Sequence, residues 1–184
     1  MRPMLLAVTA AAITFFPAFA QPEARFETNM GNFTVLLEPD KAPATVANFV
    51  RYVKQGHYNG TIFYRVVPDF VIQAGSLGAD GKWRKLNKPI GIETATGLSN
   101  KRGTIAMART NNPDSATAQF FINVVDNKGL DRSNKSAGYA VFGQVVEGMD
   151  VVDQIRRVET GDAGGHENVP VKDVIIRSVR RATK

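Results

Sequence analysis

The amino-acid sequence predicts a mainly β fold, an antiparallel β-barrel capped by two α-helices. Short runs rich in Val, Ile, Phe and Tyr recur along the chain and are bounded by Gly, Pro and Asn, as strands usually are. Only two segments show the periodicity of a helix, one early and one late in the chain. Because the strands do not alternate with long helices, a doubly wound parallel sheet is disfavoured.

The first two strands are predicted to form a hairpin. Residues 25–28 and 32–38 both have strand character, and Asn29-Met30-Gly31 between them is typical of a tight turn. The stretch 75–100 is rich in Gly, Lys and Asn and has little periodicity, which predicts a surface loop. The remaining strands are predicted at residues 62–67, 70–74, 103–108, 120–124, 140–145 and 174–179.

The two predicted helices each carry one apolar face. Asp40-Lys41-Ala42-Pro43 opens the first helix, with the proline in the first turn, where its missing N–H breaks no hydrogen bond. Gly56 ends this helix, and a shorter helix is predicted at residues 149–156. The apolar positions predicted to face the core are Val46, Phe49, Val50 and Val53 in the first helix and Val151, Val152 and Ile155 in the second.

The N-terminus is predicted to be a signal peptide, residues 1–20, followed by one domain at residues 21–184. Met1-Arg2-Pro3 is a short basic start, residues 4–16 are apolar and uncharged, and Ala18-Phe19-Ala20 fits the small-x-small cleavage pattern. The alternative is a transmembrane anchor, but a membrane span needs about 20 apolar residues and this core is shorter. We therefore expect an exported protein whose mature form begins at Gln21.

Composition narrows the function classes further. The chain contains no cysteine, which excludes thiol catalysis, thiolate metal sites and disulfides. His57 and His166 are the only histidines, and neither lies in a metal-binding spacing, so no metal site is expected. The net charge is +6, but no Lys/Arg run is interleaved with aromatic residues, so nucleic-acid binding is not expected.

Two polar residues stand out within apolar strands. Arg65 lies in the run 62–67 and points to the face opposite to Tyr64 and Val66, while Gln73 lies in the next apolar run. A charged side chain in such a strand must face water or a ligand, because burying it unpaired is costly. Both readings remain open from the pattern alone.

A pair of adjacent phenylalanines raises a similar question. Phe120 and Phe121 lie in a predicted strand, so one ring faces the core and the other the opposite face. The second ring is then either part of an apolar binding surface or another buried core aromatic.

Taken together, these segments resemble the cyclophilin family of peptidyl-prolyl cis-trans isomerases, and above all the periplasmic cyclophilins of Gram-negative bacteria. Asn59-Gly60-Thr61 is also similar to the family, and the matching order covers nearly the whole mature chain. The segments that carry the resemblance are Phe63-Tyr64-Arg65-Val66, Phe70-Val71-Ile72-Gln73-Ala74-Gly75, Ala106-Met107-Ala108, Gln119-Phe120-Phe121-Ile122 and Val141-Phe142-Gly143.

The resemblance implies a closed eight-stranded antiparallel β-barrel capped by two α-helices, with the active groove on its outer face. It implies that Arg65 is the catalytic arginine, that Gln73 orients the substrate carbonyl and that Phe70 belongs to the catalytic set. It implies no cofactor and no metal. The residues it places in substrate binding are Met107, Ala108, Arg109, Gln119, Phe121, Leu130 and Tyr139.

Three positions depart from the family pattern. Gly129 stands where many relatives have Trp, a residue associated with tight cyclosporin binding, so sensitivity to that drug is left open. Tyr139 stands where relatives often have His, and Arg109 where many have Asn.

The expected partners are proline-containing segments of exported proteins. No binding to nucleic acid is expected, and none to a membrane after signal cleavage. The protein is expected to be a monomer. Two other functions remain open. One is a module that binds proline-containing segments without isomerising them, and the other is a holdase-type chaperone with a general apolar surface.

Overall fold

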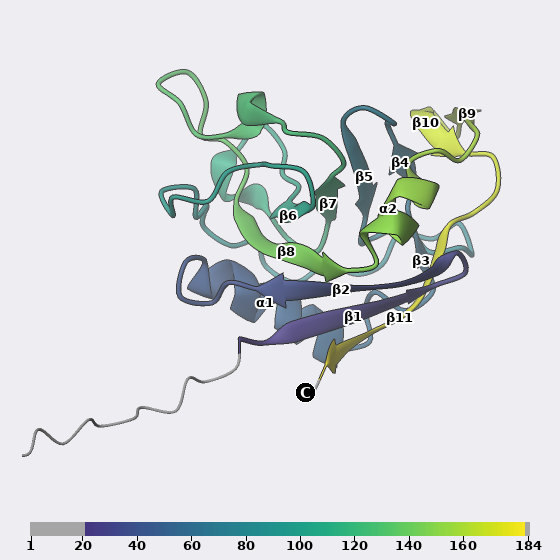
Figure 1. Cartoon of the computed structure of the whole chain (residues 1–184), viewed down its shortest axis with the longest axis horizontal. Helices are drawn as coiled ribbons and strands as arrows, with labels where there is room; N and C mark the ends of the chain where they lie inside the picture. Colours follow the sequence, from purple (N-terminus) through teal and green to yellow (C-terminus); the bar gives the residue numbers. More distant parts are fainter. Residues whose placement is uncertain (1–20, 183–184) are drawn as a thin grey trace, which may run out of the picture.

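The computed structural model describes residues 21–182, so the predicted signal peptide lies outside the described residues. Within this range the chain is mainly β, with two α-helices (Figure 1). The elements in chain order are β1 (Glu23–Thr28), β2 (Gly31–Leu37), α1 (Pro43–Lys54), β3 (Thr61–Ile62), β4 (Arg65–Val66), β5 (Val71–Ala74), β6 (Thr104–Met107), η1 (Pro113–Ser115), β7 (Phe120–Asn123), η2 (Lys128–Leu130), β8 (Val141–Glu147), α2 (Met149–Ile155), β9 (Thr160–Ala163), β10 (His166–Pro170) and β11 (Ile175–Ala182).

The main sheet is antiparallel throughout and has nine strands in the order β3-β11-β1-β2-β8-β6-β7-β5-β4. Its two edge strands, β3 and β4, are neighbours in the chain and are separated only by Phe63 and Tyr64. Counted as one interrupted strand, they reduce the sheet to the eight strands of the predicted barrel, and the covalent link between the edges is compatible with closure. The predicted fold class is confirmed.

Aromatic side chains fill the interior of the curled sheet. Phe120 lies at its centre, with ring centroids 5.6 Å from Phe26 and 5.5 Å from Tyr58. Helix α1 contributes Phe49, whose ring lies 5.2 Å from those of Tyr58 and Phe142. All of these rings are fully buried, so α1 and the strands share one continuous core.

The predicted apolar stripe of α1 does pack on this core, but unevenly. Val46 and Phe49 are buried, whereas Val50 and Val53 are only partly buried, and Tyr52 adds a fully buried ring. The helix begins with Pro43 in its first turn, as the sequence predicts.

The structure differs from the sequence prediction in two places. The predicted strand 62–67 is interrupted at Phe63 and Tyr64, because β3 pairs with β11 while β4 pairs with β5 on the other edge. The sequence analysis does not predict the hairpin β9–β10, because its strands are polar and mostly exposed and so show no apolar pattern. Its turn, Gly164-Gly165, has the positive φ angles of 59° and 79° that favour glycine, and β10 packs against β4 (Figure 1).

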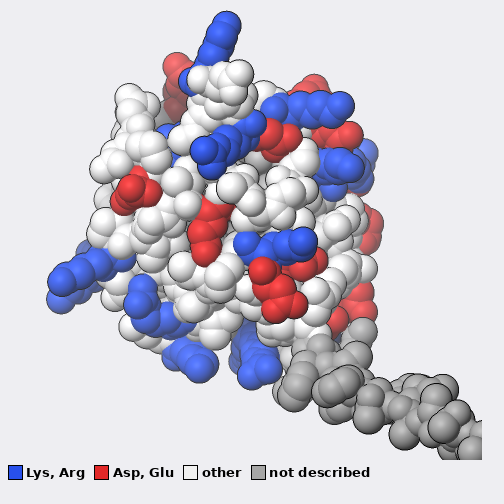
Figure 2. Space-filling model, turned by 90° about the vertical axis from the view of Figure 1, so that its left-hand side faces the viewer, with Lys and Arg blue, Asp and Glu red and all other residues white. Residues whose placement is uncertain are grey.

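On one face of the molecule the surface charges are mixed rather than segregated (Figure 2). On the face shown in Figure 2, basic side chains are interspersed with acidic and uncharged ones. Arg102 and Asp153 form one of the surface ion pairs, at 2.8 Å. Among residues 21–182, no helix is long and apolar enough to cross a bilayer.

Candidate active site

The strand register places a row of side chains on the outer face of the sheet. Arg65 in β4 lies opposite Gln73 in β5, which lies opposite Phe121 in β7. Phe121 in turn lies opposite Ala106 in β6, and Ala106 opposite Val141 in β8. Directly paired residues of an antiparallel sheet share a face. The polar and aromatic residues singled out in the sequence therefore meet on one surface.

A cavity of about 110 Å³ opens on this row. Phe121 and Val71 form buried walls, with exposed fractions of 4% and 2%. The ring of Tyr139 meets Phe121 edge-on, with centroids 5.6 Å apart. The residues that line the cavity are Arg65, Phe70, Val71, Gln73, Ala108, Arg109, Phe121, Leu130 and Tyr139.

Arg65 brings a positive charge to the rim of this cavity. Its Nη1 donates a hydrogen bond to Oε1 of Gln73 at 3.3 Å, and its Cζ lies 5.7 Å from the centroid of the Phe70 ring. No acidic side chain of the described part of the chain forms an ion pair with Arg65. The guanidinium therefore remains available to a ligand in the cavity.

Gln73 is held in one orientation by a second layer of polar side chains. Its Nε2 donates to Oη of Tyr64 at 2.5 Å and to Oε1 of Gln119 at 3.3 Å, and Tyr64 Oη itself donates to Gln119 Oε1. Burial raises the pKa of Tyr64 to about 12, although the nearby Arg65 charge acts in the opposite direction. The hydroxyl is thus protonated at neutral pH, and the amide oxygen of Gln73 is directed toward Arg65.

Arg109 lies on the opposite side of the cavity and differs from Arg65. Its Nε donates to the carbonyl oxygen of Gly138 at 2.9 Å, and its Nη1 donates to that of Thr110 at 2.8 Å. Its Cζ lies 4.6 Å from the centroid of the Tyr139 ring. Arg109 therefore forms part of the cavity lining with its Nε and Nη1 already engaged.

A buried polar network supports the cavity from below. Nδ2 of Asn127 donates to the carbonyl oxygen of Phe70 at 2.9 Å, and Nδ2 of Asn100 donates to that of Leu130 at 3.2 Å. Sequence reasoning missed these positioning residues, because an asparagine in a loop or at a strand end carries no distinctive pattern.

The carboxylate of Asp131 anchors the same network. Partial burial of this group acts to raise its pKa, but hydrogen bonds from Ser99 and Asn100 outweigh it and hold the pKa below its usual value. The backbone N–H of Asn100 donates to Asp131 Oδ1 at 2.7 Å. An ionised Asp131 thereby fixes the loop that carries Leu130.

The structure places two of the predicted site residues, Met107 and Gln119, outside the lining of the cavity. The resemblance puts Met107 in the pocket wall, whereas in the structure Met107 is 1% exposed and lies opposite Phe120 on the inner face. Its neighbours Ala106 and Ala108 face the cavity side instead. Gln119 reaches the cavity only through Gln73 and Tyr64.

Val71 is a cavity residue that the sequence analysis did not single out. The signal was present, because Val71 and Gln73 are two residues apart in one strand and must share a face. Gly129, the sequence neighbour of the cavity residue Leu130, has open space around it, since a Cβ there would meet no heavy atom within 4 Å.

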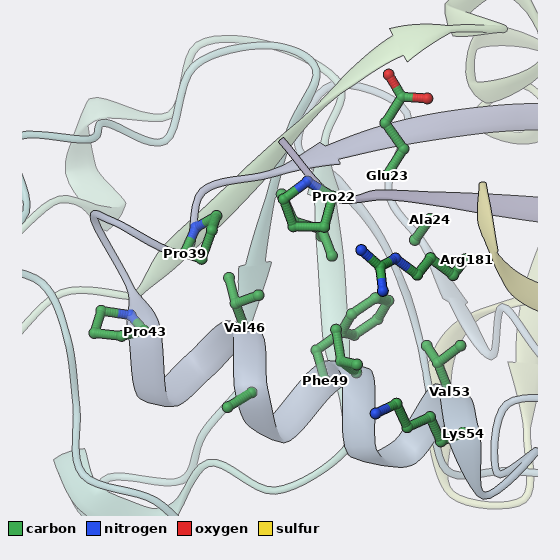
Figure 3. A pocket seen from close by; sticks show the side chains of 13 residues that line it. Pro22, Glu23, Ala24, Pro39, Pro43, Val46, Phe49, Val53, Lys54 and Arg181 are labelled. Atoms are coloured by element: carbon green, nitrogen blue, oxygen red, sulfur yellow. The ribbon is translucent and has the colours of Figure 1, made fainter. Parts of the chain in front are cut away.

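A second cavity, of about 360 Å³, lies between α1 and the ends of β1 and β11, and shares no lining residue with the first. Figure 3 shows Val46 and Phe49 directed into it, with Lys54 and Arg181 reaching toward the same space. Its walls are mainly apolar and lack a polar network like that around Gln73. Among residues 21–182, no group of three His, Asp or Glu side chains could hold a metal ion.

Comparison with known proteins decides the family. The model of the cyclophilin type peptidyl-prolyl cis-trans isomerase family matches residues 24–181. The chain belongs to this family. The cyclophilin is therefore a peptidyl-prolyl cis-trans isomerase, as the sequence motifs predict.

Named relatives and solved structures agree with this. The cyclophilin is 48% identical to peptidyl-prolyl cis-trans isomerase A of Dickeya dadantii, over 97% of this chain and 96% of that protein. It is 53% identical to peptidyl-prolyl cis-trans isomerase B of Escherichia coli, over 84% of this chain and 96% of that protein. A cyclophilin structure from Cryptosporidium parvum has the same fold, with a TM-score of 0.75, 22% identity, and coverage of 89% of this chain and 99% of that chain.

Proposed function

We propose that this isomerase catalyses rotation about X-Pro bonds of exported proteins at the outer-face cavity, and that Arg65 stabilises the twisted amide. The observation that carries the proposal is the guanidinium of Arg65, free of any ion pair within residues 21–182, beside a cavity walled by Phe121 and Val71. The apolar walls fit a proline ring, and the charge lies at the rim.

The chemistry of the reaction explains why these groups suffice. Resonance in the amide gives the X-Pro bond a rotation barrier of about 18–20 kcal/mol. In the twisted state the prolyl nitrogen loses conjugation and regains a basic lone pair. A fixed positive charge near that nitrogen lowers the energy of the twisted state more than that of either planar form, which is what acceleration requires. No bond breaks, so the reaction calls for no nucleophile, metal or cofactor.

Gln73 and the wall residues take the positioning roles. The amide nitrogen of Gln73 donates to Tyr64 and Gln119, and its oxygen accepts from Arg65, so Gln73 holds the guanidinium at the rim of the cavity. Ala108 and Arg109 line the cavity, and we assign this segment to the substrate residues that precede the proline. A Cryptosporidium parvum cyclophilin of the same fold has been crystallised in the presence of the dipeptide Ala-Pro, which supports a proline-containing ligand.

Exchange NMR on a short peptide with one X-Pro bond tests the activity. We expect catalytic amounts of the protein to cause exchange between the cis and trans signals of the peptide, which without enzyme interconvert over tens to hundreds of seconds. The method needs no coupled protease, so it separates turnover from binding. Chemical-shift changes without exchange would contradict the proposal and favour a binding module instead.

That second candidate is supported by one feature, the open space around Gly129. An incompletely walled cavity could hold a proline ring loosely. If exchange is absent, a Gly129→Phe variant that restores it would assign the loss to this opening.

We also propose that the protein is exported to the periplasm, acts there as a monomer, and assists the folding of exported proteins. The support is the signal-like pattern of residues 1–20. When the full chain is expressed in a Gram-negative host, mass spectrometry of the periplasmic fraction should find a protein that begins at Gln21. An Ala20→Phe variant should remain uncut, since the peptidase needs a small residue there. Recovery of the full-length chain from the cytoplasm would contradict export.

A further inference from the structure

Three aromatic rings form a cluster next to Gln73, and only one of them, Tyr64, has a part in the proposed reaction. Tyr64 and Trp83 have ring centroids 5.6 Å apart, Trp83 and His166 6.0 Å, and Tyr64 and His166 6.1 Å. All three pairs are edge-to-face, the geometry that aromatic side chains prefer. The rings thus contact one another pairwise.

Each ring comes from a different part of the fold. Tyr64 lies between β3 and β4, His166 is the first residue of β10, and β10 packs against β4. Trp83 is held by a tight loop in which it bridges to Leu77 and the N–H of Gly78 bonds to the carbonyl of Lys82 at 2.9 Å. The cluster is therefore built before any ligand arrives.

The cluster is connected to the catalytic arginine through one side chain. The hydroxyl of Tyr64 accepts a hydrogen bond from Gln73, and Gln73 accepts one from Arg65. A substrate that contacts Arg65 and continues past Tyr64 would next meet Trp83 and His166.

Trp83 has an open ring surface to offer. It is 51% exposed, although tryptophan has the largest apolar surface of any side chain. Half-exposed tryptophans next to a binding groove are typical anchors for a ligand side chain. The open part of this ring is thus suited to cover a substrate side chain.

The direction of the substrate follows from the two sides of the cavity. The proposed function places the residues before the proline along Ala108 and Arg109, which follow β6. Strands β7 and β5 lie between β6 and β4, so Tyr64 and Arg65 are on the far side of the cavity. The residues after the proline therefore leave the cavity toward Tyr64.

We propose that Trp83 and His166, with Tyr64 beside them, form a subsite for an uncharged aromatic side chain just after the substrate proline. This inference rests on the proposed isomerase function and adds a sequence preference to it. The basic residues that flank Trp83 in the sequence argue against a cationic side chain, because like charges repel. These flanking residues are Lys82 and Lys85, whereas Arg84 is paired with Asp80.

Isomerisation rates on matched peptides test the subsite. The series Ala-Ala-Pro-Xaa-Ala, with Phe, Ala or Arg at Xaa, keeps the proline and its preceding residues constant. We expect kcat/KM for the Phe peptide to exceed that for the Ala peptide by about threefold to tenfold, the size of one aromatic contact. The Arg peptide should show no such gain.

Variants then assign the preference to the cluster. Trp83→Ala should reduce the Phe-to-Ala ratio to about one while leaving kcat/KM on the Ala peptide unchanged. His166→Ala, from another element, should lower the ratio in part. Val146→Ala, which removes side-chain surface at a position 48% exposed in β8, should leave it unchanged.

A spectroscopic readout comes from the protein itself. Trp83 is the only tryptophan in the chain, so intrinsic fluorescence reports on this position alone. The Phe peptide should change the emission of the wild-type protein more than the Ala peptide does, and it should still do so in the Arg65→Ala variant, which retains the cluster.

The outcomes distinguish this inference from the proposed function. Activity on the Ala peptide with no Phe preference, or a preference that survives Trp83→Ala, would overturn the subsite alone. An equal gain when Phe precedes the proline would overturn its direction. No activity on any peptide, with the fluorescence change retained, would overturn the isomerase function but not the subsite.

Discussion

Replacing Arg65 with alanine is expected to lower kcat/KM on a short X-Pro peptide by about 100-fold to 1,000-fold, the usual effect of removing one preorganised group that stabilises a transition state. The loss should appear mainly in kcat, because the positive charge acts on the twisted amide and much less on the planar ground states. Exchange NMR or a protease-free rate assay measures the effect directly.

The fold should survive this substitution. Arg65 is only partly buried, and the one side-chain hydrogen bond that it forms within residues 21–182, to Gln73, is 3.3 Å long. We expect the free energy of unfolding to change by no more than about 1 kcal/mol. Arg65→Lys keeps the charge but loses the planar fork, so it should recover part of the rate. Near-wild-type activity of Arg65→Ala would remove this residue from the mechanism.

The adjacent phenylalanines of β7 should separate catalysis from stability. Phe121→Ala removes a wall of the cavity and is expected to lower kcat/KM by about tenfold to 100-fold, as the loss of an apolar contact to substrate does. Phe120→Ala removes a fully buried ring from the core and should destabilise the fold by about 3–5 kcal/mol. Urea unfolding and peptide isomerisation rates, measured on both variants, give the two effects.

This pair is its own control, since the same residue type is changed at neighbouring positions of one strand. A loss of 3–5 kcal/mol is a large part of the stability of a typical domain, so the milder Phe120→Leu is a companion variant. Phe120→Leu should keep wild-type kcat/KM per folded molecule. Equal losses of activity at both positions would contradict the assignment of Phe121 to the cavity.

Local pattern was enough to predict much of this molecule. The stripe in α1 and its proline start are local features, because helical periodicity and N-terminal preferences act within a few residues. The two-sided character of Phe120 and Phe121 likewise follows from the period of a strand. The residues that the motifs place at the site, Arg65 and Gln73, are brought together on one face by β4 and β5.

What local pattern could not supply is the pairing of distant strands. Met107 and Ala106 differ by one residue, yet one faces the core and the other the cavity side, and only the register between β6 and β7 decides which. The pattern of apolar residues also does not predict the hairpin β9–β10. This hairpin is stabilised by its glycine turn and by packing against β4. The asparagine network beneath Phe70 depends on the same long-range pairing.

The segment from Thr61 to Val66 contributes a strand to each edge of the sheet, and Arg65 lies within it. A lid or hinge that carried this side chain would have to detach one edge from its partner strand, breaking hydrogen bonds with β11 or β5. The architecture therefore favours a rigid active site over one that opens and closes during the reaction. During each turnover the substrate is then the part that moves: its segments before and after the X-Pro bond rotate relative to each other while the protein surface stays fixed.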